Sequence, residues 1–346
     1  MKSLQENLPL SAWTTFGVGG NARYFLDATS EEAIIDGLDY ARRKNLPVFV
    51  LGGGSNLLVS DRGFDGLVLR IGLKGMTWEG SRLRAAAGED WDAVVAACVA
   101  RGLGGVECLS GIPGLAGGTP VQNVGAYGQE TADVLVSVVV LDRHAGQRLD
   151  LSKQQCGFAY RSSIFNTIHK DRYIVLSIDY ELRAGAEPQL KYPDLRRRFE
   201  GKTSLPTLAE IRTAVREIRA AKGMLLVEGD ADCRSAGSFF KNPILSEAEY
   251  SRLQDNAPEG VPRYPAGTGT VKTSAAWLIE RAGFKKGFAM GAAAVSTKHT
   301  LALVNRGGAK AGDIIRLARE IRRGVEDTFG IRLVPEPVFI GFDEDF

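Results

Sequence analysis

Residues 48–56 read Val-Phe-Val-Leu-Gly-Gly-Gly-Ser-Asn, an apolar strand that runs directly into three glycines and two small polar residues. Glycine lets a backbone approach a ligand closely, and successive N–H groups in such a turn form a concave site for an anion. A plain strand-to-strand turn is the alternative, but it needs one or two glycines, not three followed by Ser and Asn. We therefore predict that residues 52–56, the first glycine loop, bind a pyrophosphate.

The chain on both sides of this loop predicts alternating helices and strands. One helix starts after Ser30 and carries apolar residues at helical spacing up to Ala41, and another starts after the N-cap residue Asp90. Apolar strands are expected at 57–59 and 67–71. This order of elements indicates an α+β protein.

Residues 110–128, the second glycine-rich segment, read Ser-Gly-Ile-Pro-Gly-Leu-Ala-Gly-Gly-Thr-Pro-Val-Gln-Asn-Val-Gly-Ala-Tyr-Gly. A long segment without helical or strand periodicity is usually a functional loop or disordered, and its apolar residues argue against disorder. A loop that merely packs is one interpretation. Because its glycines leave many main-chain amides to face a flat polar heterocycle, we predict instead that it covers a flavin or a nucleotide.

The later elements are indicated by turn and cap signals. Residues 134–141 and 147–151 predict a hairpin around Ala145-Gly146. Thr207-Leu208-Ala209-Glu210 and Ser246-Glu247-Ala248-Glu249 are capping boxes that each open a helix. A last amphipathic helix is expected around residues 314–325.

One glycine pattern near the N-terminus is misleading. Gly17-Val18-Gly19-Gly20-Asn21-Ala22 formally satisfies the dinucleotide-binding fingerprint. That fingerprint requires an apolar strand before it and a helix after it, whereas a strand-like run follows here. We predict a plain turn or loop.

Composition excludes several classes of protein. A chain of 346 residues fits two or three domains. Its net charge of +2 provides no field for nucleic acid or an anionic membrane, and no apolar run is long enough to span a bilayer. Four scattered cysteines and three histidines indicate reduced thiols in a cytoplasmic protein and no metal site.

The segment Ala-Gly-Ser-Phe-Phe-Lys-Asn-Pro at residues 236–243, the Ser-Lys segment, supports two different enzymes. Ser238 and Lys241 have the spacing of a serine acyl-enzyme and its activating lysine. That enzyme also needs a Ser-Asp-Asn triplet and a Lys-Thr-Gly strand; the chain has neither, and Lys272-Thr273-Ser274 comes closest. The alternative is a flavoenzyme in which Ser238 donates a proton.

Several motifs favour the flavoenzyme because they occur together in the order of one family. They are Thr15-Phe16-Gly17-Val18-Gly19-Gly20, the two glycine segments, Tyr160-Arg161-Ser162-Ser163-Ile164-Phe165, the Ser-Lys segment, Ala275-Ala276-Trp277-Leu278-Ile279 and Pro335-Glu336. From about Thr15 to Gly341 the chain resembles the UDP-N-acetylenolpyruvoylglucosamine reductases of bacterial peptidoglycan synthesis. It is most similar to the branch with a tyrosine in the substrate loop.

The resemblance implies a two-lobed FAD-binding domain of the vanillyl-alcohol-oxidase (PCMH) type and a C-terminal α/β substrate-binding domain. Residues 1–70 and 71–205 would form the two lobes, with 336–346 returning to the first, and 206–335 would form the substrate domain. Some relatives bind FAD covalently through His or Cys. The first glycine loop holds neither and Cys108 lies outside the central contacts, so non-covalent FAD is expected.

The resemblance also implies a reaction and its residues. NADPH would reduce FAD, and a hydride would then pass to the enolpyruvyl group of UDP-N-acetylglucosamine enolpyruvate to give UDP-N-acetylmuramate. Ser238 would protonate the other carbon, while Arg161 and Glu336 would stabilise the developing enolate, Glu336 as a neutral acid or through Arg161. FAD would contact Gly52, Gly53, Gly54, Ser55, Asn56, Ile112, Pro113, Thr119, Gly125, Ala126 and Tyr127, and the substrate would contact Tyr192, Lys222 and Asn242.

Two further alternatives remain: a flavin-dependent oxidase on the same fold, and a catalytically silent flavin-binding module. The presence of Arg161, Ser238 and Glu336 disfavours the silent module. A UDP-sugar is the expected small-molecule partner, with no nucleic acid or membrane, and a monomer is expected.

Overall fold

The computed structural model describes residues 4–185, 187–188, 190–257 and 260–343. It divides into two compact units. The first comprises the chain up to Leu8, Ala22–Gly54 and Asp65–Ala221. The second comprises Pro9–Asn21, Ser55–Phe64 and the described residues from Lys222 onward.

The first unit holds four α-helices and most of the strands in the first half of the described chain. One terminal residue each of β1, β2 and β5 (Pro9, Asn21 and Phe64) falls in the second unit. The helices of the first unit are α1 (Glu31–Arg43), α2 (Trp91–Ala100), α3 (Pro193–Arg198) and α4 (Leu208–Ala221). Its strands are β1 (Leu4–Pro9), β2 (Asn21–Ala28), β3 (Val48–Leu51), β5 (Phe64–Ile71), β6 (Met76–Glu79), β7 (Arg82–Ala86), β8 (Leu103–Gly104), β9 (Gly125–Ala126), β10 (Gln129–Glu130), β11 (Leu135–Asp142), β12 (Gln147–Ser152), β13 (Tyr173–Glu181) and β14 (Arg183–Ala184).

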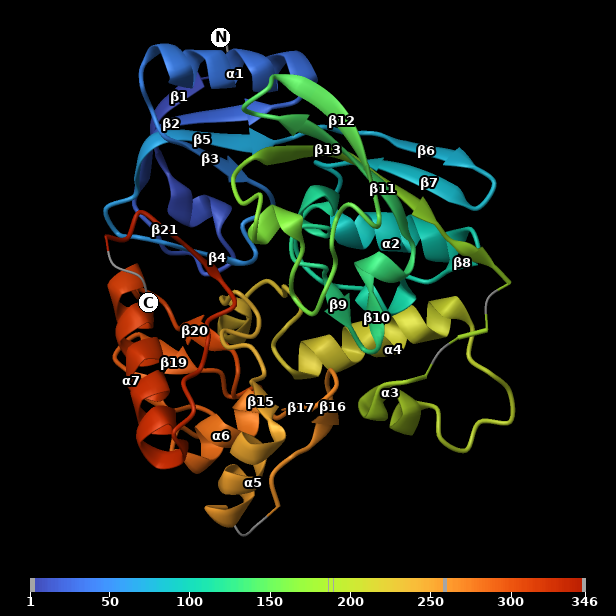
Figure 1. Cartoon of the computed structure of the whole chain (residues 1–346), viewed down its shortest axis with the longest axis vertical. Coiled ribbons are helices and arrows are strands. Elements are labelled where there is room, and N and C mark those ends of the chain that lie inside the picture. The colour runs from blue at the N-terminus through green and yellow to red at the C-terminus, as the bar shows by residue number, and fades with distance from the viewer. Residues whose placement is uncertain (1–3, 186, 189, 258–259, 344–346) are drawn as a thin grey trace. The chain divides into compact units, whose positions relative to one another are not determined.

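The first sheet of this unit has the strand order β1-β2-β5-β3, in which β3 and β5 are parallel. Helix α1 runs across it (Figure 1) and buries Ile34 and Ala41 in the same core as Leu67 of β5. Gly37 permits the close approach, since a Cβ there would lie 2.7 Å from a Leu26 methyl group. The helix predicted after Ser30 is confirmed, and the Ser30 hydroxyl accepts the Ala33 N–H at 3.1 Å.

The second sheet has the order β12-β11-β13-β7-β6, and each neighbouring pair is antiparallel. Its β11–β12 hairpin turns between Asp142 and Gln147, as predicted. Helix α2 begins after its N-cap Asp90, also as predicted, and buries Trp91 and Val95 in the core that the two sheets share.

The second glycine-rich segment is ordered without being regular. It contains the short 3₁₀ turn Ala116–Gly118 and the strand β9, which pairs with β10. Thr119 and Asn123 are buried. The predicted absence of periodicity and of disorder is confirmed.

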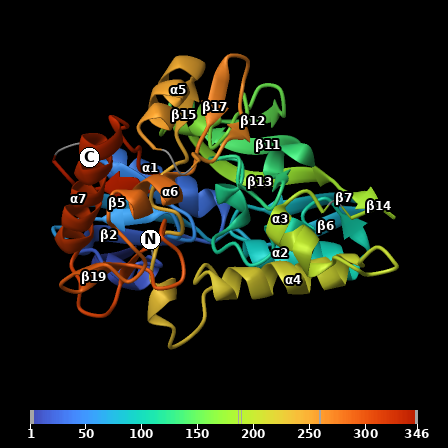
Figure 2. The same ribbon diagram turned by 90° about the horizontal axis from the view of Figure 1, so that it is seen from below.

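Helices α3 and α4 lie side by side at the end of the first unit (Figure 2). Leu195 and Phe199 of α3 pack on Ile211 and Val215 of α4. The predicted capping box starts α4, where the Glu210 N–H donates to the Thr207 hydroxyl at 3.2 Å.

The second unit holds the remaining elements. Its helices are α5 (Glu247–Asp255), α6 (Ala275–Arg281) and α7 (Ala311–Phe329). Its strands are β4 (Leu57–Val59), β15 (Ile244–Ser246), β16 (Tyr264–Pro265), β17 (Thr270–Lys272), β18 (Ala289–Met290), β19 (Ala293–Val295), β20 (Leu303–Asn305) and β21 (Val338–Ile340).

Apolar faces of α6 and α7 form the core of this unit together with Phe239 and Phe240 of the Ser-Lys segment. Strand β21 pairs in parallel with β4, so the C-terminal segment returns to a strand within residues 1–70. The predicted turn or loop is confirmed: residues 17–20 form an irregular loop, β2 follows it, and a Cβ on Gly20 would lie 2.3 Å from the Asp61 carbonyl oxygen.

The compact units follow packing and do not test the functional division into 1–70, 71–205 and 206–335. Helix α4 packs in the first unit, and the second unit resumes at Lys222. Within the described residues, no helix combines the length and apolar character that crossing a bilayer requires.

Candidate active site

The first glycine loop is a place where two backbones touch. A Cβ on Gly53 would lie 2.5 Å from the Gly114 Cα and 3.1 Å from the Leu115 nitrogen, so only glycine fits against the second glycine-rich segment. A Cβ on Gly52 would meet no atom within 4 Å. The loop therefore offers main-chain N–H groups beside open space, which fits a pyrophosphate held by backbone donors.

The loop continues into the second unit at Ser55 and Asn56. There the Asn56 side-chain amide donates to the Glu336 carbonyl oxygen at 3.3 Å, and the Val338 N–H donates to the Asn56 carbonyl oxygen at 2.9 Å. Within this unit, Asn56 of the predicted cofactor site and Glu336 of the predicted catalytic set are direct neighbours.

Buried hydrogen bonds hold the middle of the second glycine-rich segment. The Thr119 hydroxyl donates to the Ala116 carbonyl oxygen at 2.8 Å and lies 2.9 Å from the hydroxyl of Tyr180. Thr119 is 3% exposed, so its side chain stabilises the segment from the protein interior. Ile112, Pro113, Gly125 and Ala126 are partly exposed.

Backbone strain is concentrated at two of the predicted residues. Among the described non-glycine residues with positive φ, four are Asn or Asp, which tolerate this region, and the others are Tyr127 (φ 51°) and Arg161 (φ 52°). An arginine or tyrosine in this region costs about 1–3 kcal/mol and persists only where the surroundings impose it. Such strain is typical of functional sites.

Arg161 is oriented by the second glycine-rich segment. Its Nη2 donates to the Gly125 carbonyl oxygen at 2.8 Å, and its guanidinium lies 5.5 Å from the centroid of the Tyr160 ring. The Arg161 carbonyl oxygen accepts the Asn166 side-chain amide at 3.2 Å, which helps to hold the left-handed backbone. A guanidinium fixed in this way is suited to binding a carboxylate.

Tyr192 precedes α3 and packs edge-on against Tyr127, with ring centroids 5.1 Å apart. Tyr192 is 39% exposed, whereas Tyr127 is buried. The first unit thus brings together a residue predicted to bind the substrate and one predicted to bind FAD.

The Ser-Lys segment runs antiparallel to the residues that lead into Glu336. The Glu336 N–H donates to the Phe239 carbonyl oxygen at 2.8 Å, and the Lys241 N–H donates to the Val334 carbonyl oxygen at 2.9 Å. On the other side, the Phe239 N–H donates to the Leu301 carbonyl oxygen at 2.7 Å. Ser238 and Glu336 are both partly exposed, on neighbouring strands of backbone.

Two predicted substrate residues, Asn242 of the Ser-Lys segment and Lys222, also belong to the second unit. The side-chain oxygen of Asn242 accepts the Ala275 N–H at 3.0 Å, so Asn242 also supports the start of α6. Lys222 lies near His299: burial, followed by the charges of Lys222 and Lys286, lowers the pKa of His299 to about 4. His299 was not predicted.

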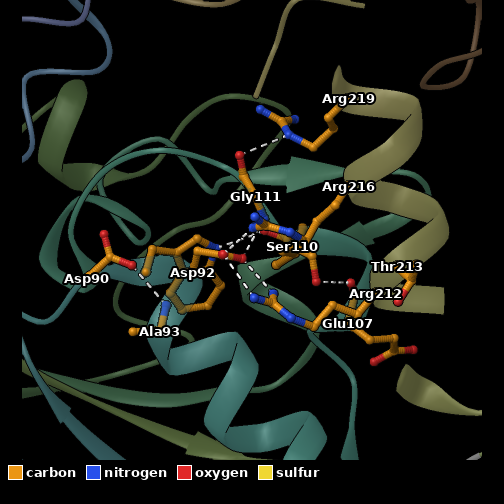
Figure 3. A network of polar contacts seen from close by, with 12 residues as sticks. Asp90, Asp92, Ala93, Glu107, Ser110, Gly111, Arg212, Thr213, Arg216 and Arg219 are labelled. Atoms are coloured by element: carbon orange, nitrogen blue, oxygen red, sulfur yellow. Dashed lines mark hydrogen bonds and ion pairs between the residues drawn. The ribbon is translucent and has the colours of Figure 1, made fainter. Parts of the chain in front are cut away.

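Sequence reasoning also missed a polar network behind the second glycine-rich segment, formed by Asp92 of α2 and three arginines of α4 (Figure 3). The signal was present as arginines at helical spacing, Arg212, Arg216 and Arg219. Such spacing is more often a solvated helix face, and only the packing of α4 shows otherwise.

Comparisons with known proteins identify both parts of the chain. Residues 22–152 match the family model described as FAD binding domain, and residues 229–340 match the one described as UDP-N-acetylenolpyruvoylglucosamine reductase, C-terminal domain. The predicted order of an FAD-binding domain followed by a C-terminal reductase domain is confirmed.

Full-length relatives cover the whole chain. The UDP-N-acetylenolpyruvoylglucosamine reductase of Thermobifida fusca is 48% identical over 98% of both chains, and that of Streptomyces coelicolor is 46% identical over 99% of this chain and 92% of its own. The crystal structure of the reductase from Thermus caldophilus has a TM-score of 0.67 at 27% identity and covers 97% of this chain and 99% of its own. This chain therefore belongs to the UDP-N-acetylenolpyruvoylglucosamine reductase family.

Proposed function

We propose that this FAD-dependent oxidoreductase reduces UDP-N-acetylglucosamine enolpyruvate to UDP-N-acetylmuramate, a step of peptidoglycan precursor synthesis, with Arg161, Ser238 and Glu336 as its catalytic residues. The chemistry that bound FAD supplies is transfer of a hydride from NADPH to the enolpyruvyl double bond. The observation that carries the residue assignment is the backbone pairing of the Ser-Lys segment with Glu336.

Addition of hydride to one vinyl carbon places negative charge on the other carbon and on the substrate carboxylate, and a proton must follow. Ser238 donates that proton: it is partly exposed and directly precedes Phe239, whose carbonyl oxygen accepts the Glu336 N–H. A serine hydroxyl is a weak acid, so positive charge nearby has to assist it.

Arg161 stabilises the negative charge of the developing enolate. Its guanidinium donates to the Gly125 carbonyl oxygen at 2.8 Å, which holds it in one orientation toward a carboxylate ligand. Glu336, between two prolines, has a backbone restricted on both sides and acts as a neutral hydrogen-bond donor or through Arg161.

FAD is held non-covalently by the two glycine segments. The close contact of Gly53 with Gly114 and the open space at Gly52 support this assignment. Burial raises the pKa of the Cys108 thiol to about 12, so this cysteine is protonated and inert toward a covalent flavin bond. Tyr192, Lys222 and Asn242 bind the UDP-sugar.

The enzyme works as a cytoplasmic monomer. All four cysteines are buried free thiols, as expected in a reducing compartment. Sedimentation of the purified protein tests the monomer, because a dimer would double the measured mass.

The reaction is tested by flavin absorbance. Purified protein should be yellow, lose its colour with NADPH under anaerobic conditions, and regain it when the enolpyruvyl substrate is added but only slowly with oxygen. Rapid recolouring by oxygen alone would favour the flavin oxidase, and a colourless protein that binds no FAD would exclude both flavoenzymes.

The role of Ser238 is tested by Ser238→Ala, with Ser238→Thr as the control that keeps a hydroxyl. Reduction of the flavin by NADPH should stay near normal, while the substrate half-reaction should slow by about 10²-fold or more in Ser238→Ala. Stopped-flow absorbance separates the halves. An equal loss in both would show that Ser238 is not the proton donor.

A further inference from the structure

The carboxylate of Asp92, in the first turn of α2, joins the second glycine-rich segment to α4. Its Oδ1 accepts the Gly111 N–H at 2.6 Å. Arg212 donates to both carboxylate oxygens, at 2.5 and 2.9 Å, and Arg216 donates to Oδ2 (Figure 3). Asp92 is therefore shared between one backbone amide and two arginines.

Arg219 binds the carbonyl group of Gly111, the residue whose N–H Asp92 accepts. The Nε of Arg219 donates to the Gly111 carbonyl oxygen at 3.0 Å, and Arg219 is 8% exposed (Figure 3). Gly111 has φ +70°, a conformation that favours glycine. Side chains from two helices thus hold both the N–H and the C=O of one glycine in the segment.

Arg219 also reaches the far end of the segment. The side chain of Tyr127 hydrogen-bonds to Arg219, and burial is the main factor that lowers the pKa of Arg219. One buried guanidinium therefore links Gly111, near the start of the segment, to Tyr127, near its end.

The first residue of α2 and the chain just before that helix hold more of the segment by their backbone. The Trp91 N–H donates to the Gly114 carbonyl oxygen at 3.0 Å, and the Ala116 N–H donates to the Glu89 carbonyl oxygen at 2.8 Å. Gly114 is the residue that touches Gly53 of the first glycine loop. A shift at Gly111 would be passed along three residues to the point where the two glycine segments meet.

The charges of this network are partly withdrawn from water: the side chain of Asp92 is 25% exposed and that of Arg212 is 18% exposed. Burial alone would raise the pKa of Asp92, but hydrogen bonds from Arg212 and the Gly111 N–H, with the charges of Arg212 and Arg216, lower it below its ordinary value. Buried ionic groups are seldom the most stable solution for a fold, since apolar side chains of similar volume often do better. Holding a loop in one position is a reason to keep them.

We propose that Asp92 and Arg219 are positioning residues for FAD: they fix Gly111 and Tyr127, and thereby the surface that the second glycine-rich segment presents to the flavin. This inference rests on the FAD contacts assigned under the proposed function. A merely structural brace between α2 and α4 is the competing explanation.

The test compares FAD affinity with the stability of the FAD-free protein. Asp92→Asn and Arg219→Gln remove the two anchors. Asp142→Asn is a matched control: Asp142 accepts two bonds from Arg172, at 3.0 and 2.7 Å, and the His144 N–H at 2.9 Å, all away from the glycine segments. Dissociation constants come from quenching of flavin fluorescence, and melting temperatures come from calorimetry of the FAD-free protein.

All three variants should lower the melting temperature of the FAD-free protein. Asp92→Asn and Arg219→Gln should also weaken FAD binding by about tenfold, whereas Asp142→Asn should stay within about twofold of wild type. Arg219→Lys should be intermediate, because one ammonium can reach Gly111 or Tyr127 but cannot hold both in a fixed fork.

Wild-type FAD affinity in both anchor variants, or equal weakening in Asp142→Asn, would reduce the network to a structural brace and overturn the proposal. If an anchor variant fails to fold, Arg216→Gln replaces that variant, because the Arg216 side chain is 38% exposed and its loss disturbs the fold less. Arg216→Gln should weaken FAD binding by about twofold to fivefold. No weakening there also counts against the proposal. Failure of wild-type protein to bind FAD would instead overturn the proposed function.

Discussion

Gly53→Ala tests the contact between the two glycine segments. The added methyl group would lie 2.5 Å from the Gly114 Cα, 2.9 Å from the Gly114 carbonyl carbon and 3.1 Å from the Leu115 nitrogen. All three are backbone atoms that cannot turn aside as a side chain can, so one segment has to move. Overpacking of this kind costs about 1–3 kcal/mol.

For a unit of this size, each kcal/mol corresponds to about 2–4 °C in melting temperature. We therefore expect FAD-free Gly53→Ala to melt about 2–12 °C below wild type in a calorimetric scan. FAD binding should weaken as well, because the displaced segments are those proposed to hold the cofactor.

Two matched glycines separate the causes. Gly52→Ala meets no atom within 4 Å, so its FAD-free stability should be unchanged or slightly raised, while a methyl group in the proposed pyrophosphate space should weaken FAD binding by about tenfold. Gly267→Ala, whose nearest neighbour is the Thr270 hydroxyl at 3.5 Å, should change neither. A wild-type melting temperature for Gly53→Ala would refute the backbone contact, and wild-type FAD affinity for Gly52→Ala would refute the phosphate site.

Three further predictions concern pH and the substrate. Burial, and then the charges of Lys222 and Lys286, lower the pKa of His299 from 6.5 to about 4, so as pH falls the unfolded chain binds a proton at this residue before the folded protein does. The free energy of unfolding of the wild type should therefore fall by roughly 3 kcal/mol between pH 6.5 and 4. In urea titrations, His299→Gln should make the free energy of unfolding less dependent on pH over this range. Hydrogen bonds from Arg172 lower the pKa of Asp142 from 3.8 to about 2, so the stability that they contribute is present above pH 4 and is lost as pH falls through 2. Asp142→Asn should remove this loss of stability in acid. An acid unfolding transition identical to that of the wild type would contradict the prediction. Tyr192→Ala should raise KM for the UDP-sugar several-fold, with a smaller effect on flavin reduction by NADPH. Tyr192→Phe keeps the ring against Tyr127 and should leave KM near the wild-type value. A wild-type KM in Tyr192→Ala would remove Tyr192 from the substrate site.

Local signals predicted the elements well because their causes are local. The Ser30 and Thr207 hydroxyls accept N–H groups three residues ahead, and Asp90 accepts the Ala93 N–H at 2.8 Å. A cap and the helix that it starts are neighbours in the sequence, so the pattern contains the whole interaction. The resemblance then supplied the fold and the chemistry that no single motif carried.

The network around Gly111 was not predictable in the same way. Asp92 binds Arg212 across 120 positions and Arg219 binds Gly111 across 108. Nothing in the spacing of three arginines on α4 says which face is buried or against what. The strained φ of Arg161 is equally invisible in a sequence, because tertiary contacts impose it against the residue's own preference.

The amino-acid sequence by itself determined the helices, the strands and the glycine segments of this reductase, because caps, turns and glycine conformations depend on residues a few positions apart. Only the tertiary structure decided that Gly53 meets Gly114, that the Ser-Lys segment lies against Glu336, and that an ionic network holds Gly111. The physical reason is that such contacts join distant segments, and packing selects them from many pairings that the sequence alone would allow.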